Sequence, residues 1–198
     1  REDQETYLVR NLAGLLHDIG KRYRGIQGKH DKGHTTYHGH EDTSAQITER
    51  VLRRMGAPKR IIERVKALIG VHLKPHIFMG GDGKPKAFRK YVRDFEDWPH
   101  SIDLAIADNL GKQDYTEDQI PSEIDKYEAL RGRIQEAIPT GTTGTKLQRP
   151  ITGRDLIEIG VPQGPLMGQI MRAIDEVLLE DPSLSKEDAL SIAHSHLN

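Results

Sequence analysis

Apolar residues recur every three or four positions through almost the whole chain, and this spacing most constrains its fold. It is the period of an amphipathic α-helix, and no segment shows the strict alternation typical of a half-buried strand. The chain has 198 residues, enough for one well-buried domain or for a domain plus a small appendage. We therefore predict an all-α fold with no β-strand.

Before residue 139, two polar loops interrupt the helical pattern. Residues 20–41 form a long loop rich in Gly, Lys, Arg and His, and a loop of this length within a domain is usually functional or disordered. We expect Gly20 to cap the helix before this loop, and the stretch 43–46 to form a capping box for the helix after it. Residues 73–85 form a second loop, and its glycine-rich stretch 80–84 is interpreted as a turn because it lacks the context of a phosphate loop.

The best boundary in the chain is the segment 139–150, which combines Pro, Gly and Thr and has no apolar period. Such a composition is typical of a flexible linker. We therefore predict a helical domain over residues 1–138 and a small helical segment over 151–198. The chain starts with Arg1 and helical spacing is present from its first residues, so we expect a piece of a longer protein.

Composition excludes several classes of protein. No apolar run approaches the length of a membrane span, and the mean hydropathy is −0.64. The formal net charge is −1, so any contact with RNA has to come from local patches rather than from a general basic field. The chain has no cysteine, which excludes disulfides and thiolate metal sites. This suits a reducing cytoplasm, which is the location we expect.

The chemistry of the chain centres on His17 and Asp18, which follow an apolar helical run and precede Ile19-Gly20-Lys21. An imidazole beside a carboxylate offers one nitrogen and one oxygen ligand to a divalent metal ion. The alternative is a histidine at a helix C-terminus, stabilised by the helix dipole, with a solvated acidic neighbour. The apolar flanks favour the metal site.

Three further residues fall where metal ligands could be supplied. His40 precedes an expected helix, His72 ends one, and Asp108 lies on the apolar face of another. His40 could instead be an exposed loop residue, and His72 a helix cap. Asp108 needs a partner if it is buried, which favours a ligand over an idle carboxylate. The other loop histidines (His30, His34 and His38) and the acidic pair Glu41 and Asp42 fit solvated positions better.

This ordered set resembles the HD-domain superfamily of metal-dependent phosphohydrolases. The stretches 15–21 (LLHDIGK), 37–41 (YHGHE), 71–75 (VHLKP) and 105–111 (AIADNLG) are similar to the HD region of bacterial CCA-adding tRNA nucleotidyltransferases and poly(A) polymerase-like proteins. Beyond the linker, 151–160 (ITGRDLIEIG) and 164–168 (GPLMG) resemble the C-terminal segment of the same family. The resemblance implies an HD-type helical bundle followed by a small helical C-terminal segment.

The resemblance also implies roles for individual residues. His17, Asp18 and Asp108 would be primary metal ligands, and His40 and His72 would hold a second metal or contact phosphate. Mn, Ni, Co, Fe or Mg would suit such a nitrogen and carboxylate site. Asp18 would orient the attacking water, and Lys21 would neutralise phosphate charge with help from Lys74.

The chain departs from the family in two ways. It has no Asp-x-Asp pair, so it lacks the nucleotidyltransferase head that would add nucleotides. HD domains also usually draw another histidine ligand from upstream, and the sixteen residues before His17 contain none. A histidine of the 30–40 loop could replace it, or the site is incomplete.

Two functions from different classes follow. The first is a metal-dependent phosphohydrolase acting on nucleotide or RNA-end phosphates, with 2′,3′-cyclic phosphodiesters or 2′-phosphates as the substrates that the family favours. The second is a non-catalytic body and tail that positions a tRNA-like RNA. For either function, the basic residues Arg89 and Arg93 are candidates for substrate contact, although such runs are often just solvated helix faces.

Overall fold

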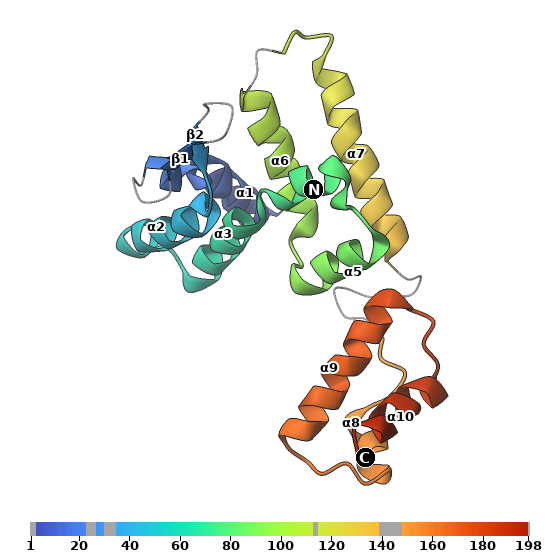
Figure 1. The fold of residues 1–198 in the computed structure, drawn as a ribbon. Coiled ribbons are helices and arrows are strands. Elements are labelled where there is room, and N and C mark those ends of the chain that lie inside the picture. The colour runs from blue at the N-terminus through green and yellow to red at the C-terminus, as the bar shows by residue number, and fades with distance from the viewer. Residues whose placement is uncertain (1–2, 23–26, 30–34, 113–114, 139–147, 198) are drawn as a thin grey trace. The chain divides into compact units, whose positions relative to one another are not determined.

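The computed structural model describes residues 3–22, 27–29, 35–112, 115–138 and 148–197. Helices dominate these residues, as Figure 1 shows, and the predicted all-α class is confirmed. The expectation that no strand would occur is wrong. Strand β1 (Gln27–Lys29) pairs antiparallel with β2 (Thr35–Tyr37), with Gly28 opposite Thr36. The β-branched and aromatic residues of β2 suit an extended backbone, but a strand of this length is too short to show a clear period.

The chain divides into two compact units. The first comprises Arg1–Gly83 and Asp97–Arg133, and the second comprises Lys84–Glu96 and Ile134–Asn198. This division groups residues 84–96 with the C-terminal helices, whereas we expected a single domain over 1–138. Most of the expected linker, 139–150, lies outside the described residues.

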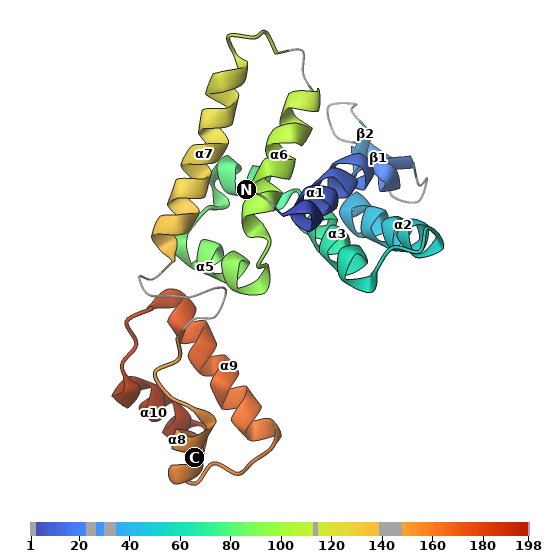
Figure 2. The same cartoon turned by 180° about the vertical axis from the view of Figure 1, so that it is seen from behind.

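The first unit is a bundle in which α1, α2 and α3 lie side by side, as both views show (Figures 1 and 2). Its helices are α1 (Gln4–Leu16), α2 (His40–Arg54), α3 (Lys59–Val71), the short α4 (Lys74–Ile77), α6 (Trp98–Lys112) and most of α7 (Ile120–Ala137). Each contributes its apolar stripe to the interior. The buried side chains include Val9, Ala13, Leu16, Leu52, Ile61, Ile62, Val65, Leu68, Ile69, Ile102, Leu104, Ala105 and Leu130.

The first helix ends earlier than its pattern predicts. Helix α1 stops at Leu16 with His17 as its C-cap, and Gly20 lies inside a following 3₁₀-helix, η1 (Ile19–Arg22), instead of capping α1. Gly20 is needed for another reason. A Cβ there would lie 2.7 Å from the backbone oxygen of His40 and 2.7 Å from the backbone nitrogen of Ser44, so only glycine lets η1 approach α2 this closely.

The second helix begins earlier than expected. Gly39, at a φ of 75°, precedes His40, the first residue of α2. The predicted capping box at 43–46 is therefore wrong, because Thr43 is already helical and its hydroxyl donates to the Gly39 carbonyl at 3.2 Å. Glu41 and Asp42 lie in the first turn, where the helix dipole favours negative charge.

The expected loop over 73–85 is also mostly helical. It contains α4 and a single π-turn, η3 (Phe78–Asp82), with Gly81 at a φ of 121°. Pro75 is tolerated because it lies in the first turn of α4. Ser101 lies within α6 and donates to the carbonyl of Trp98 at 2.6 Å.

The second unit contains α5 (Pro85–Asp94), α8 (Gly153–Glu158), α9 (Pro165–Glu180) and α10 (Lys186–Ser195). Helices α8, α9 and α10 surround an apolar core, and α5 contacts α9. Thr152 forms a capping box with Asp155, and Ser185 caps α10. The core cluster consists of Ile151, Leu156, Val161, Ile170, Ile174, Leu178, Ala189 and Ala193. Among the described helices of the whole chain, none is long and apolar enough to cross a membrane.

Candidate metal centre

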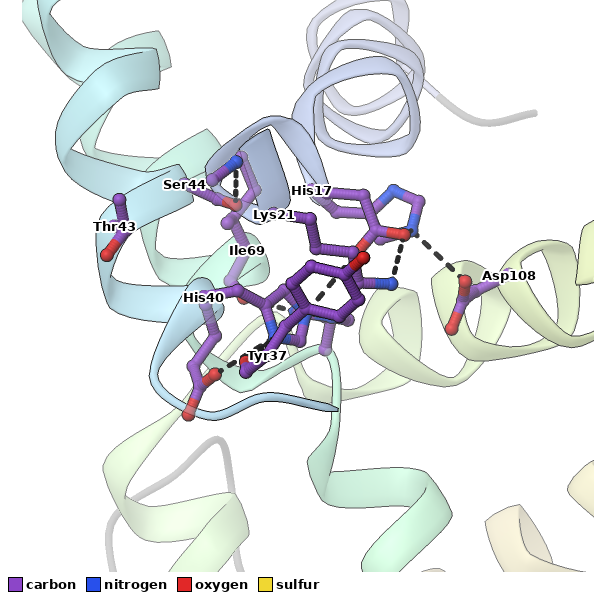
Figure 3. A network of polar contacts seen from close by, with 12 residues as sticks. His17, Lys21, Tyr37, His40, Thr43, Ser44, Ile69 and Asp108 are labelled. Carbon is purple, nitrogen blue, oxygen red and sulfur yellow. Dashed lines mark hydrogen bonds and ion pairs between the residues drawn. The ribbon is translucent and has the colours of Figure 1, made fainter. Parts of the chain in front are cut away.

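The five predicted metal ligands come together in the first unit, at the ends of three helices and on the side of a fourth. His17 and Asp18 follow α1, His40 opens α2, His72 caps α3, and Asp108 lies on α6. Figure 3 shows His17 and His40 facing one common space from these separate elements, with Asp108 at its side. His40, His72 and Asp108 are buried, with 6%, 1% and 7% of their surface exposed.

Three of the imidazoles are oriented in the same way. In His17, His40 and His72, Nδ1 lies 2.7 or 2.8 Å from the backbone carbonyl oxygen three residues earlier. A carbonyl only accepts, so Nδ1 must carry the proton. Each neutral ring therefore presents the lone pair of Nε2 toward the centre, which is the form that binds metal ions.

The Nε2 atoms face groups that are acceptors like themselves. Nε2 of His40 lies 3.2 Å from Nε2 of His72 and 3.2 Å from Oδ1 of Asp18. Nε2 of His17 lies 3.1 Å from Oδ1 of Asp108 and 3.4 Å from Oδ2 of Asp18. Lone pairs at these separations repel unless a proton or a metal ion lies between them, so the centre requires positive charge.

The protonation of the site shows the same need for a cation. Burial disfavours a charged His17, but the carboxylates of Asp108 and Asp18 outweigh burial and raise its pKa to about 10. Burial lowers the pKa of His72 to about 4, and His17 and His40 act in the same direction, so His72 is neutral at pH 7. A bound metal ion would supply the charge that a proton on His17 otherwise supplies.

The two carboxylates stay ionised. Burial alone would raise their pKa values, but His17 and Lys21 hold the pKa of Asp18 well below its usual range. His17, His76 and Lys112 do the same for Asp108. Oδ1 of Asp18 is buried and accepts no hydrogen bond, since its neighbour at 3.2 Å, Nε2 of His40, presents a lone pair. An orphaned buried carboxylate oxygen costs stability unless a ligand occupies it.

The ligand atoms form two overlapping groups. Asp18, His40 and His72 make one, and His17, Asp18 and Asp108 make the other, with the atoms of each group within 4.8 Å of one another. Asp18 belongs to both groups, so its carboxylate could bridge two ions. The nitrogen and oxygen donors fit the transition metals Mn, Fe, Co and Ni, and no thiolate is present to favour softer metals.

Three further residues around this centre were not predicted from the sequence. His76 Nε2 donates to Oδ2 of Asp108 at 3.2 Å, and the Tyr127 hydroxyl donates to Nδ1 of His76 at 3.0 Å. Burial and nearby acidic groups raise the pKa of Tyr127 to about 12, which keeps this donor protonated. Lys112 forms an ion pair with Asp108. His76 and Lys112 lie four residues after His72 and Asp108, a spacing of one helical turn that could have indicated them.

The four predicted substrate-binding residues have different surroundings. Lys21 lies at the centre, where its Nζ contacts Oδ2 of Asp18 at 2.6 Å, and Lys74 is exposed on α4. Arg89 and Arg93 belong to the second unit. Arg89 donates to the carbonyls of Leu179 and Glu180 at the end of α9, and Arg93 pairs with acidic side chains. These contacts give both arginines a structural role, so we leave them out of the proposed substrate site.

Two hollows open beside the metal-ligand cluster. One, of about 300 Å³, includes Lys21, Tyr37 and His40 in its lining, and the other, of about 230 Å³, includes His17, Asp108 and Lys112. A larger hollow of about 500 Å³ runs along the outer face of α2 and contains none of the predicted ligands. Volume alone therefore does not locate the site. The side chains around the two smaller hollows do.

The fold and the His–Asp cluster define a class of protein. The model of the HD domain family matches residues 9–130, and the chain belongs to this family. Among characterised proteins, the chain is 28% identical to the CC-adding tRNA nucleotidyltransferase of Thermus thermophilus over 193 residues, which is 93% of this chain and 39% of that protein. It is 24% identical to the A-adding tRNA nucleotidyltransferase of Deinococcus radiodurans over 170 residues, 85% of this chain and 37% of that protein. The chain therefore spans about two fifths of the length of the relatives it matches.

Proposed function

We propose that the chain is a metal-dependent phosphohydrolase acting on nucleotide or RNA-end phosphates. One observation carries this proposal. The Nε2 atoms of His17, His40 and His72 face carboxylate oxygens or one another, and Oδ1 of Asp18 is buried without a hydrogen bond, an arrangement that is unfavourable without a cation. A site built only for stability would not leave these acceptors facing one another.

His17, Asp18, His40, His72 and Asp108 would hold the metal. A bound divalent cation polarises a phosphoryl oxygen and lowers the pKa of a coordinated water. The second oxygen of Asp18 contacts Lys21, which orients this carboxylate beside the place where water and phosphate would meet. Lys21 and Lys112 lie next to the two carboxylates and supply positive charge for the phosphate.

His76 and Tyr127 act on Asp108 rather than on the substrate. The chain of donors from Tyr127 through His76 ends on Oδ2 of Asp108, while Oδ1 faces His17. Fixing one oxygen in this way leaves the other oriented toward the cluster. Such support of metal ligands by neighbouring hydrogen bonds commonly sets their affinity.

The proposed substrates are 2′,3′-cyclic phosphodiesters and 2′-phosphates of nucleotides or RNA ends, and the proposed location is the cytoplasm. The similarity to the A-adding and CC-adding tRNA nucleotidyltransferases supports an RNA-related substrate, because the names of both relatives specify tRNA. The same similarity supports the alternative, a non-catalytic body and tail that positions a tRNA-like RNA for a catalytic head.

Metal content and hydrolysis of 2′,3′-cyclic AMP separate the two functions. We expect purified protein to bind Mn, Ni or Co and to hydrolyse this substrate, and Asp18→Ala to lose at least 100-fold in kcat/KM together with most of its metal. Asp125→Ala is the matched control, because Asp125 is exposed on α7 and the same chemical change there should leave both measurements unaltered. Wild-type protein that binds metal but shows no hydrolysis would favour the alternative.

A further inference from the structure

Beside the metal-ligand cluster lies the hollow of about 300 Å³, whose lining includes Tyr37, Glu41 and Leu73. We propose that this hollow, the Tyr37 pocket, is a nucleoside subsite in which Tyr37 stacks on the base and Glu41 accepts a hydrogen bond. The inference rests on the proposed function, since it assigns the part of a nucleotide that lies away from the reacting phosphate. The volume is at the lower end of the range for small-molecule sites.

The walls of the Tyr37 pocket suit a flat ring. Tyr37 is held by β2, where its backbone pairs with Gln27, so its ring is presented from a fixed strand. Leu73 adds an apolar wall, and the ammonium of Lys21 lies 6.0 Å from the centre of the Tyr37 ring. Stacking on an aromatic side chain is the common way in which proteins bind unpaired bases.

The charges of the Tyr37 pocket favour a neutral group over a phosphate. Lys21 forms an ion pair with Asp18, which offsets part of its charge. Glu41 adds a carboxylate whose Oε2 is buried and accepts no hydrogen bond. This oxygen lies 3.5 Å from Nδ1 of His40, but the proton of that nitrogen goes to the carbonyl of Tyr37. The Glu41 side chain as a whole is 28% exposed and lines the hollow, so its negative charge would repel phosphate, and the exposed part of its carboxylate would accept an N–H of a base or a hydroxyl of a ribose.

The position of the Tyr37 pocket next to the metal-ligand cluster also supports a nucleoside subsite. His40 lines it and at the same time contacts Asp18 and His72 in the cluster. A nucleoside in the Tyr37 pocket would thus lie one side chain away from the proposed metal ligands. Its phosphate would extend toward the cluster, where the second hollow is lined by His17, Asp108 and Lys112.

Calorimetric binding of adenosine 3′-monophosphate and of inorganic phosphate tests this assignment on the whole chain loaded with Mn. Tyr37→Ala should weaken nucleotide binding about tenfold and leave phosphate binding unchanged, whereas Tyr37→Phe should bind both like wild type. Tyr7→Ala is the control, since Tyr7 is a 60% exposed tyrosine on α1. Equal affinities of wild type and Tyr37→Ala for the nucleotide would overturn the proposal.

A second variant distinguishes a direct role in binding from a loss of the local fold. Glu41→Gln keeps the shape of the side chain but weakens its acceptor, and should lower nucleotide affinity about threefold to tenfold while phosphate binding stays the same or improves. Equal losses for both probes would mean a structural role and would overturn the assignment. Failure of the hydrolase proposal looks different: wild type would not cleave 2′,3′-cyclic AMP, yet nucleotide binding would still depend on Tyr37.

Discussion

The interiors of the two compact units of this chain differ in whether they bury polar residues. All seven buried polar or charged residues among those the structure describes belong to the first unit, and His40, His72 and Asp108 are among them. The core cluster of the second unit consists of eight apolar residues. Burying a polar group costs free energy unless a partner satisfies it, whereas burying an apolar side chain is favourable by itself.

This contrast separates residues that stabilise the fold by apolar burial from polar residues that we propose bind a ligand. The interior of the second unit is explained by burial alone, with capped helices around an Ile and Leu core. The interior of the first unit is only partly explained in this way, because Asp18 and the facing Nε2 atoms of His40 and His72 remain unsatisfied within the protein. We infer that a ligand is their partner, and the experiments below test this difference.

The largest loss of stability is expected when a substitution creates a cavity in the second unit. Ile174 is fully buried on α9, so Ile174→Ala should reduce the free energy of unfolding by about 2–5 kcal/mol. Urea denaturation measures this loss, and hydrogen exchange followed by mass spectrometry assigns it to peptides of the second unit.

Metal affinity should be unchanged in Ile174→Ala, because none of the proposed ligands lies in that unit. Ile157→Ala is the control, since Ile157 is 46% exposed on α8 and its loss should change stability by less than about 0.5 kcal/mol. A Mn affinity that falls together with stability in Ile174→Ala would contradict the separation of the two interiors.

Adding metal should stabilise the first unit and leave the second unit unchanged. A ligand that binds only the folded state at 100 times its Kd stabilises that state by about 2.7 kcal/mol. Titration with Mn, Ni or Co should therefore slow amide exchange around His17, His40 and His72 and leave the α9 and α10 peptides unaffected. Chelation with EDTA should reverse the change, and Asp18→Ala should show none of it. Equal protection of both units, or of neither, would refute the assignment of the cluster as a metal site.

Much of this contrast could be predicted from the sequence, because helical periodicity and chemically distinctive residues are local signals. The apolar spacing indicates the main helices, and the five candidate ligands, which lie far apart in the sequence, come together in the structure. The ends of helices were less predictable. Helix α1 stops at Leu16 and α2 starts at His40 because η1 packs against α2 through Gly20, and that contact depends on tertiary structure.

The residues that surround the ligands were missed for a related reason. His76 was assigned to a loop because Pro75 and the nearby glycines are typical of turns, yet it lies on α4 one helical turn after His72. Tyr127 fitted the apolar stripe of α7, and only the structure places its hydroxyl on His76. A long-range hydrogen bond of this kind leaves no periodic trace in the sequence.

The smallest expected effect concerns an ion-pair network in the first unit away from the metal centre. Asp103 accepts hydrogen bonds from Arg131 at 2.7 Å and Arg10 at 3.2 Å, which join α6 to α7 and α1. Burial opposes ionisation of Asp103, but Arg131, with His100 and Arg10, outweighs it and lowers the pKa of this carboxyl below its ordinary value.

Because the folded-state pKa of Asp103 is the lower one, its ionised form stabilises the fold above the unfolded-state pKa of about 3.9. This contribution is lost as the pH falls through the folded-state pKa. Asp103→Asn should therefore cost about 1 kcal/mol near pH 7, and the gap between wild type and variant should narrow below about pH 4. Urea unfolding at a series of pH values measures the gap, with Asp125→Asn as an exposed control. A gap that widens as the pH falls would show that Asp103 is not stabilised as the carboxylate.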